Sequence, residues 1–344
     1  MSIALHADTE NYASIDDLLG DGSSRFFSQG YKSTNPNLHE LAVSHTASES
    51  LLTAYASLEM RGVWSVKGSS DQTPHLGTTD VLVLACRMAE ALLASRYSPE
   101  ILPEAYLKSV IISGGREPVE GALSRIECQG KLEGSKNGNS STLRFSVASM
   151  NAVLEVSHDS TELGLASVQS PSEDALVGAS EKRLYGDLWS GRKVLLEDVQ
   201  LKSANEDANA RLSFEQEFSP GSLGDLRGLE AEYPHDLSAL EYFVSTLQLG
   251  QALLYRLDSM ERADSNTLWM RRTHITFNRP KHHEASWSET GLNVRLDRSR
   301  LVLRDGESWR CADIVGTHDV GEVVCSVAHR LPTSVAIKAT GVDQ

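Results

Sequence analysis

Two long stretches of the chain carry apolar residues at helical spacing and almost no polar face. The first runs from Thr78 to Arg96 and the second from Leu237 to Leu257. This periodicity predicts one long helix in each half of the chain. A helix that is apolar nearly all round is typical of a segment covered on every side, so we expect a sheet to wrap around each one.

Shorter strand-like segments flank the two helices, and they are recognised by alternation or by β-branched content. Two extended segments are predicted between Ser50 and Val66. Near the start of the chain, Ser14 is predicted to cap a short helix that ends before Gly20. The remaining predicted strands are Ala105 to Ser113, Gly121 to Lys131, Thr142 to Ala148, Ala152 to Val156, Lys193 to Leu201, Ala210 to Gln216, Thr267 to Asn278, Glu284 to Leu296, Leu301 to Arg304, Ser308 to Val315 and Glu322 to His329.

The two halves share one order of parts: strands, a Pro-His dipeptide, one apolar helix and a run of strands. The dipeptides end at His75 and His235, and an acid follows each of them, Asp80 in the first half and Glu241 in the second. Ten residues after the acids come the related sequences Glu-Ala-Leu-Leu and Gln-Ala-Leu-Leu. Such repetition predicts a duplicated supersecondary unit.

One long apolar helix wrapped by an antiparallel sheet is the hotdog architecture, and hotdog units normally pair. We therefore predict an α+β protein with a double hotdog fold, in which two fused units form that pair within one chain. Another two-layer α+β fold is the alternative. The predicted divisions are an N-terminal strap (residues 1–40), a first hotdog unit (41–160), a polar linker (161–190), a second hotdog unit (191–332) and a tail (333–344).

Composition narrows the class of partner. Of the 344 residues, 40% are hydrophobic, which is a globular composition, and no run of about 18 apolar residues predicts a membrane span. The formal net charge of −15 repels nucleic acid, and no basic run offsets it. The N-terminal segment lacks the basic start and apolar run of a secretory signal, so we expect a cytoplasmic protein without nucleic-acid or membrane partners.

The cysteines and histidines do not predict a metal or a cofactor. The four cysteines are far apart and form no CxxC pair, so buried free thiols are a better interpretation than disulfides or a zinc site. The run from Lys281 to Glu284 contains two histidines, but it follows Arg279-Pro280 and is predicted to be a surface loop without metal. Neither a Gly-rich phosphate loop nor a GxSxG elbow is present.

Two acids are the main catalytic candidates. If the helices lie side by side, their first turns approach the seam between the units, and Asp80 and Glu241 come close across a pseudo-twofold axis. Each acid also has a purely structural interpretation, because the helix dipole stabilises acids in a first turn. Glu241 has apolar neighbours on both sides, so poor hydration is expected to raise its pKa and suit it to act as a general base.

Two histidines and a strand supply further candidates. His75 and His235 precede the helices and can exchange protons near neutral pH, although a Pro-His pair can also be a simple turn. In the segment Leu268 to Phe277, alternation places Arg272 and His274 on one face, where they can bind a phosphate or a carboxylate. The same alternation places Trp269, Arg271, Thr273 and Ile275 on the other face. The alternative for Arg272 and His274 is a solvent-facing side of the strand.

Three segments resemble the avirulence protein D (AvrD) family of plant-associated bacteria. They are SIDDLLG at residues 14–20, RFFSQGY at residues 25–31 and PHLGTTD at residues 74–80. The likeness extends over most of the chain, since length and order of elements also agree. The resemblance implies a role in making syringolide-type elicitors, which are secreted acyl glycosides.

In that family the enzyme is thought to join a β-ketoacyl unit to a pentulose such as xylulose. The implied partners are an acyl thioester, on an acyl carrier protein or coenzyme A, and a small sugar. A-factor-type butyrolactone synthases are more distant double-hotdog relatives. In hotdog dehydratases a histidine precedes the helix and an acid lies on it. Here the spacing from His75 to Asp80 and from His235 to Glu241 is shorter, so the acids carry over better than the histidines.

The leading hypothesis is acyl transfer from the thioester to a sugar hydroxyl. A carboxylate would take the hydroxyl proton, and helix N-terminal amides would hold the thioester oxygen. A second hypothesis keeps the fold but makes the chain a hydroxyacyl-thioester dehydratase or a thioesterase. A third makes it a non-enzymatic binding protein or a translocated effector.

Overall fold

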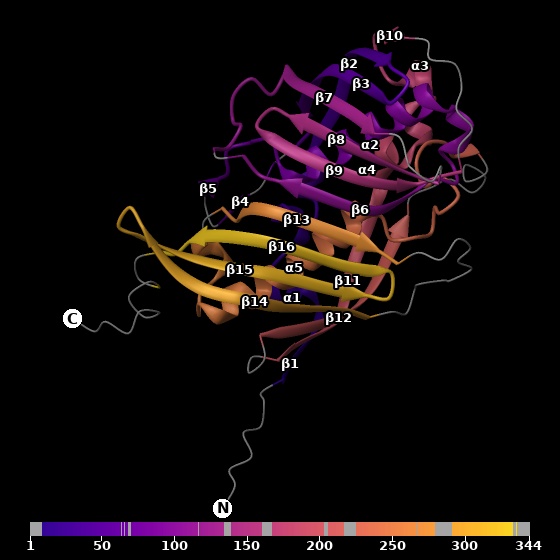
Figure 1. Ribbon diagram of the computed structural model, residues 1–344. Helices are drawn as coiled ribbons and strands as arrows, with labels where there is room; N and C mark the ends of the chain where they lie inside the picture. Colours follow the sequence, from indigo (N-terminus) through magenta and orange to yellow (C-terminus); the bar gives the residue numbers. More distant parts are fainter. Residues whose placement is uncertain are drawn as a thin grey trace, which may run out of the picture.

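The computed structural model describes residues 9–332 and residue 335, except for 63, 65, 68–69, 116, 134–138, 160–166, 203–205, 217–224, 266 and 279–290 (Figure 1). The protein belongs to the α+β class. A single 14-stranded sheet, in which every pair of neighbouring strands is antiparallel, runs through both halves of the chain. Two long helices, α2 (Thr78–Arg96) and α5 (Ala239–Leu257), pack against it.

Each half contributes six strands in an equivalent order. In the first half the neighbours run β2-β3-β7-β8-β9-β6, and in the second half they run β11-β12-β14-β15-β16-β13. The first set is β2 (Thr34–His45), β3 (Glu49–Met60), β6 (Tyr106–Ser113), β7 (Ile126–Glu133), β8 (Ser140–Val147) and β9 (Met150–Ser157). The second set is β11 (Arg192–Lys202), β12 (Asp207–Gln216), β13 (Trp269–Phe277), β14 (Gly291–Arg304), β15 (Glu307–His318) and β16 (Gly321–Arg330).

Strands β6 and β13 pair with each other at the centre and join the halves. Their register places Ile111 opposite His274 and Val110 opposite Ile275. One further strand lies at each edge of the sheet: β1 (Thr9–Ser14) pairs with β11, and β10 (Val168–Ser170) pairs with β2. The duplicated strand order therefore has its pseudo-twofold axis between β6 and β13.

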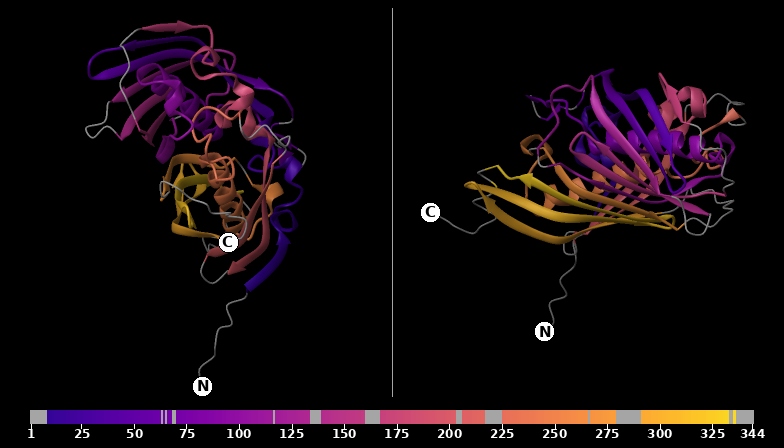
Figure 2. Two further views of the ribbon diagram at one scale, coloured as in Figure 1. Left: turned by 90° about the vertical axis from the view of Figure 1, so that its right-hand side faces the viewer. Right: turned by 45° about the horizontal axis from the view of Figure 1, so that its top comes forward.

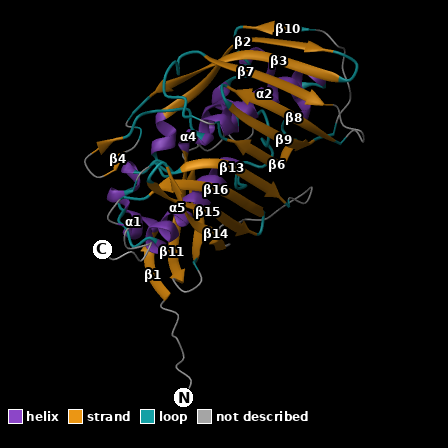
Figure 3. Ribbon diagram, turned by 60° about the vertical axis from the view of Figure 1, so that its left-hand side comes forward, coloured by secondary structure: helices purple, strands orange, loops and turns teal. Residues whose placement is uncertain are grey.

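Each half of the sheet curves around its own helix. Helix α2 contacts β2, β3, β6, β7, β8 and β9, whereas α5 contacts β11, β12, β14, β15 and β16. Figure 2 shows this curvature end-on, and Figure 3 shows both helices inside the curve of the strands. Because strands cover them, nearly all residues of both helices are buried, as their apolar sequences predict.

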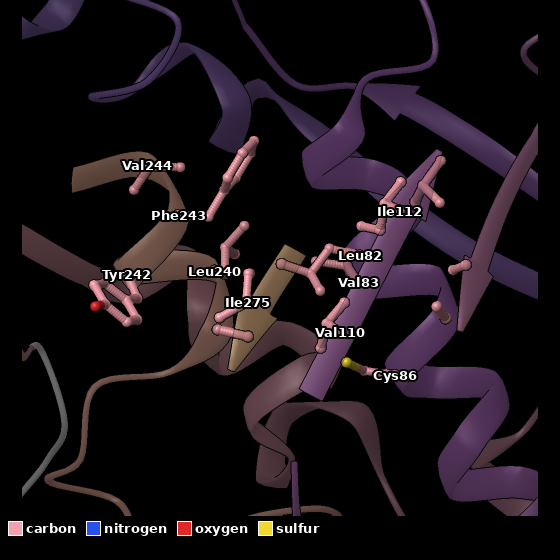
Figure 4. Packing of buried hydrophobic residues seen from close by; sticks show 14 of the residues in the cluster. Leu82, Val83, Cys86, Val110, Ile112, Leu240, Tyr242, Phe243, Val244 and Ile275 are labelled. Carbon is pink, nitrogen blue, oxygen red and sulfur yellow. The ribbon is translucent and has the colours of Figure 1, made fainter. Parts of the chain in front are cut away.

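The two helices also contact each other, so the core is continuous between the halves. Figure 4 shows Leu82 of α2 and Leu240 of α5 in this region, with Ile112 of β6 and Ile275 of β13 nearby. All four side chains are buried. Burial of this apolar surface is what stabilises the junction.

The remaining elements are short. The predicted helix after Ser14 is α1 (Ile15–Leu19), with Ser14 at its N-cap and Gly20 at its C-cap. The others are β4 (Val66–Lys67), β5 (Ser70–Asp71), α3 (Asp174–Val177), α4 (Trp189–Gly191), one π-helical turn (Leu184–Leu188) and 3₁₀ turns at Gly22–Ser24, Gly30–Ser33, Pro99–Ile101, Ser180–Lys182 and Arg262–Asp264. None of the helices within the described ranges has the length and hydropathy needed to cross a lipid bilayer.

The structure tests the predictions for the strands and the cysteines. Strand β2, which ends at His45, was not predicted, because the two extended segments were expected only from Ser50 onward. All four cysteines are free, and three of them are buried as predicted, whereas Cys311 is half-buried. The run from Lys281 to Glu284 lies outside the described residues.

Candidate active site

A cavity of about 870 Å³ opens beside the start of α2, where the two halves meet. One wall is the segment from His75 to Thr78, together with the loop that follows β6. The other wall consists of the start of β13 and residues of β14, β15 and β16. The volume lies within the range of small-molecule sites in proteins.

The imidazole of His75 lies in this cavity between two indole rings. Its ring centroid is 5.3 Å from that of Trp64 and 5.7 Å from that of Trp269. Nδ1 lies 3.1 Å from the carbonyl oxygen of Thr73. Because a carbonyl only accepts, Nδ1 carries the hydrogen in this bond, and the lone pair of the neutral ring is on Nε2. This arrangement suits Nε2 to accept a proton.

The helix that begins beside His75 has a glycine at its N-cap. Gly77 occupies that position. An N-cap serine or threonine accepts one of the first unpaired backbone N–H groups of its helix, and glycine has no side chain to do so. Gly77 and Thr78 both line the cavity. The start of α2 therefore offers N–H donors and a positive potential to an oxygen that carries negative charge.

A smaller pocket of about 60 Å³ adjoins the cavity, since His75 and Gly77 line both. Phe26 and Trp64 contribute aromatic rings to it. Gln251, from the middle of α5, contributes a polar amide. The candidate site thus combines the helix start of one half with a helix side chain of the other.

Asp80 lies directly beneath the cavity wall and does not line the cavity. Its side chain is 1% exposed. Oδ2 accepts a hydrogen bond from the Gly77 backbone N–H at 2.8 Å, and Oδ1 accepts one from the Thr34 hydroxyl at 2.6 Å. Burial raises the pKa of this carboxyl from 3.8 to about 6, and the two hydrogen bonds oppose the rise. In this position Asp80 holds the backbone of Gly77, which lines the cavity.

Glu241 occupies the equivalent place at the start of α5. Oε2 accepts a hydrogen bond from the backbone N–H of its N-cap residue, Ser238, at 2.9 Å. Oε1 lies 2.5 Å from Nε of Arg192, and both side chains are almost completely buried. The Ser238 hydroxyl in turn accepts the Glu241 backbone N–H at 3.3 Å. The charge of Glu241 at this helix start is thus balanced by Arg192.

The contacts that the structure describes do not join the two carboxyls. Asp80 binds Thr34 and Gly77, whereas Glu241 binds Ser238 and Arg192. Each acid accepts the backbone N–H of the N-cap residue of its own helix, so the geometry matches the structural interpretation offered for each. Neither acid lines the cavity or the pocket that adjoins it.

The segment leading into α5 differs from its counterpart before α2. His235 is exposed and lines neither the cavity nor the adjoining pocket. In the repeat, Glu90 of α2 corresponds to Gln251 of α5, yet Glu90 is fully buried and ion-paired with the equally buried Arg183. Glu90 also accepts the backbone N–H of Leu229 at 2.9 Å, just ahead of α5. Buried ionic contacts therefore occupy the region ahead of α5, whereas the equivalent region ahead of α2 borders the cavity.

Arg272 and His274 share one face of β13, as alternation predicts, but neither lines the cavity. The register of β13 with β16 shifts between Met270 and Arg272, which is a β-bulge at Arg271. Arg271 and Arg272 are both exposed, while Thr273 is buried. Alternation placed Arg271 on the face of Thr273 and was wrong there, because the extra residue re-aims the strand. Burial, and then the Arg272 charge, lowers the pKa of His274.

Most residues of the site were not predicted as such, among them Gln251, Trp269, Arg271 and Arg300. Gln251 carried a signal, since the repeat aligns it with an ionisable residue, Glu90. Nothing in the local sequence marks the bulge that brings Trp269 and Arg271 to the cavity. Arg300 lies on a different strand, so only the register of the sheet reveals its position.

Among the described residues, the geometry defines a protein with a duplicated helix-and-sheet unit and an open site at the first helix. The chain belongs to the Pseudomonas avirulence D protein (AvrD) family, whose profile matches residues 10–332. The curated proteins include no match.

Several solved structures show a looser likeness. The dehydratase domain from the CurF module of curacin polyketide synthase is 12% identical, with 84% of this chain and 94% of that chain covered and a TM-score of 0.35. A hotdog-fold protein from Alicyclobacillus acidocaldarius is 10% identical, with 84% and 96% covered and a TM-score of 0.36. The dehydratase domain of the polyketide protein PpsC from Mycobacterium tuberculosis is 10% identical, with 85% and 96% covered and a TM-score of 0.35. Likenesses of this degree assign no reaction to this chain.

Proposed function

We propose that this chain is an enzyme that transfers an acyl group from a thioester to a sugar hydroxyl. The proposed donor is a β-ketoacyl thioester on an acyl carrier protein or coenzyme A, and the proposed acceptor is a small sugar such as xylulose. This pair is the one implied by the resemblance to the AvrD family, and the product would be a syringolide-like elicitor. The proposal depends on one observation: His75, whose Nδ1 is bound to the Thr73 carbonyl, shares a cavity with the open start of α2.

The proposed fold assignment for both halves is the hotdog unit. Support comes from the strands that surround each long helix and from their equivalent order in the two halves. The predicted divisions at residues 40, 160, 190 and 332 stay part of this proposal.

In the proposed reaction the thioester carbonyl points at the start of α2. Nε2 of His75 takes the proton of the sugar hydroxyl, and the hydroxyl oxygen attacks the carbonyl carbon. The tetrahedral intermediate places its negative oxygen at the N–H groups near Gly77 and Thr78, which stabilise it. The carbon–sulfur bond then breaks, the thiolate takes the proton from His75, and the ester and the free thiol leave. Atoms and charge balance without a cofactor.

In this proposal Asp80 and Glu241 position the helix starts and do not exchange protons with substrate. Asp80 fixes the Gly77 backbone, which lines the cavity. Glu241 is neutralised by Arg192 and lies outside the cavity. The acid assignment made from the sequence thus becomes a positioning role, and the base becomes His75.

The dehydratase alternative demands more of the site. Removing water from a hydroxyacyl thioester takes one group that accepts a proton from carbon and another that donates a proton to the leaving hydroxyl. The α5 residue that lines the adjoining pocket with His75 is Gln251, whose amide does not titrate. Acyl transfer requires only one base and an oxyanion site, so it fits these residues better.

The experiment incubates the protein with β-ketoacyl and β-hydroxyacyl thioesters, with and without xylulose, and follows products by mass spectrometry. We expect a β-ketoacyl ester only when xylulose is present. Free acid formed without xylulose would instead favour a thioesterase, and loss of water from the β-hydroxyacyl thioester would favour a dehydratase. If no thioester is consumed, the chain is a binding protein.

Three histidine variants locate the base. His75→Gln should lower the rate by about 100-fold or more, which is the usual contribution of a general base. His39→Gln removes an exposed histidine on β2 and serves as the matched control. His235→Gln tests the equivalent position at α5, and loss of product there with full activity in His75→Gln would move the site to the second half. Circular dichroism of each variant checks that the fold is retained.

A further inference from the structure

One wall of the cavity is rich in arginine, although the formal net charge of the chain is −15. Two of its arginines have acidic partners. Nη1 of Arg298 lies 3.2 Å from Oδ2 of Asp313, and Nε of Arg304 lies 3.4 Å from Oδ2 of Asp305. The wall contains four arginines in all: Arg271, Arg298, Arg300 and Arg304.

Arg271 and Arg300 have no ion pair among the residues that the structure describes. The acids that share the cavity do not neutralise them. Asp313 and Asp305 are paired as above, and Glu307 lies 2.6 Å from Arg330. Glu117, on the loop after β6, is exposed and makes no ion pair with either arginine in the described ranges. Two guanidinium groups in one cavity therefore have no acidic partner within the described ranges and can bind an anionic ligand.

The register of the sheet shows how these two arginines are related. Arg300 pairs with Cys311, Cys311 with Ala328, and Ala328 with Trp269, two residues before Arg271. Neighbouring strands are about 4.8 Å apart, so these three steps span about 14 Å. The two residues between the arginines, Cys311 and Ala328, have small side chains and line the cavity. They therefore leave space for a ligand between Arg271 and Arg300.

Arg271 faces the cavity because of the β-bulge. The extra residue in β13 exposes both Arg271 and Arg272, and the peptide carbonyl of Arg271 accepts the Gly114 backbone N–H at 3.0 Å. That bond ties the bulge to the loop on the opposite wall of the cavity. The strand is therefore held in the conformation that directs this arginine inward.

We propose that Arg271 and Arg300 bind a phosphoryl group carried by one of the substrates. Guanidinium groups form paired, charge-assisted hydrogen bonds with phosphate oxygens, and two of them match the charge of a phosphate. This inference rests on the proposed acyl transfer and adds to it the class of ligand. The phosphoryl group belongs either to the pantetheine arm of the thioester donor or to a phosphorylated sugar acceptor.

Cys311 provides a binding assay that does not depend on turnover. It is half-buried and lines the cavity between the two arginines, whereas the other three cysteines are buried. Alkylation with iodoacetamide, followed by mass spectrometry of the peptide that contains Cys311, reports whether the cavity is occupied. A Cys311→Ser variant confirms that the signal comes from this thiol.

The ligands are compared in two pairs. Acetyl-CoA is compared with S-acetylpantetheine, which lacks phosphate, and xylulose 5-phosphate is compared with xylulose. We expect the phosphorylated member of one pair to protect Cys311 at a concentration about 10 to 100 times lower than its partner, as for charged hydrogen bonds. The pair that shows the difference identifies which substrate carries the phosphoryl group.

The variant Arg271→Gln/Arg300→Gln should abolish that difference. Arg295→Gln is the matched control, because it removes one charge from the same strand, β14, at a residue that pairs with Asp297 and does not line the cavity. In the unmodified protein, protection by the phosphorylated ligand should weaken between about 0.05 and 0.5 M salt, since ions screen the attraction. This salt test remains informative if the double variant fails to fold.

Equal protection by both members of both pairs would overturn the phosphoryl proposal. So would a difference that persists in the double variant. Phosphate-dependent protection without ester formation would leave the subsite in place and refute the acyl transfer. Ester formation without any phosphate preference would support the acyl transfer and refute the phosphoryl subsite. The two proposals can therefore fail independently of each other.

Discussion

Replacing Asp80 with asparagine should stabilise the protein at neutral pH. The carboxyl is 1% exposed and accepts hydrogen bonds from the Gly77 backbone and the Thr34 hydroxyl. Asparagine has nearly the same shape and carries no charge. Its carbonyl can accept the Gly77 N–H, and its amide can donate to the Thr34 oxygen. The change therefore removes a buried charge while keeping both contacts.

The size of the effect follows from the pKa of Asp80. Burial raises this pKa from 3.8 to about 6, and at about 1.4 kcal/mol per unit the rise corresponds to a cost of about 3 kcal/mol for the charged form. Attraction to the start of α2 returns about 0.3–1 kcal/mol, which is too little to reverse the sign. We expect Asp80→Asn to raise the free energy of unfolding by about 2 kcal/mol at pH 7.5.

The effect should depend on pH in a defined direction. Between pH 4 and pH 6 the folded protein binds more protons at Asp80 than the unfolded chain does, because its pKa is higher when folded. The contribution of Asp80 to the free energy of unfolding therefore falls as pH rises through this window. The advantage of Asp80→Asn should be largest above pH 6 and should vanish near pH 4.

Urea unfolding at pH 5.0, 6.0 and 7.5, followed by circular dichroism, measures this difference. Asp225→Asn is the control, because the Asp225 side chain is 74% exposed and its charge remains hydrated. A variant that is less stable than the parent by the same amount at every pH would refute the reasoning. That result would mean that the pKa of Asp80 does not rise on folding and that asparagine loses a contact in either charge state.

Two further substitutions test the packing around α5. Glu241→Gln should lower the free energy of unfolding by about 3–5 kcal/mol, since it leaves the buried Arg192 without its counter-charge. If this variant is as stable as the parent but forms no product, the catalytic role predicted for Glu241 is restored. Gly250→Ala should cost about 1–3 kcal/mol, because an added Cβ would lie 2.7 Å from Cδ1 of Ile314. Gly291→Ala, with only a backbone oxygen 3.9 Å away, should change the melting temperature little, and equal effects of the two glycine variants would contradict this account.

Local sequence determined the elements whose causes are local. The helix predicted from Thr78 to Arg96 has those bounds in the structure, because its apolar periodicity and length suffice to specify it. The short helix between Ser14 and Gly20 follows from its cap residues. The repeated order of parts also predicted two equivalent halves, and the strand order has that equivalence.

Only the tertiary structure decided which helix start is open. Both starts carry an acid at the same position, but Arg192 neutralises Glu241 from 49 residues away, and Glu90 pairs with Arg183, which lies 93 residues further along the chain. The bulge that turns Arg271 toward the cavity depends on the register with β16, and the distance from Arg300 depends on three strand pairings. Such contacts join residues far apart in the chain, so a local pattern cannot specify them.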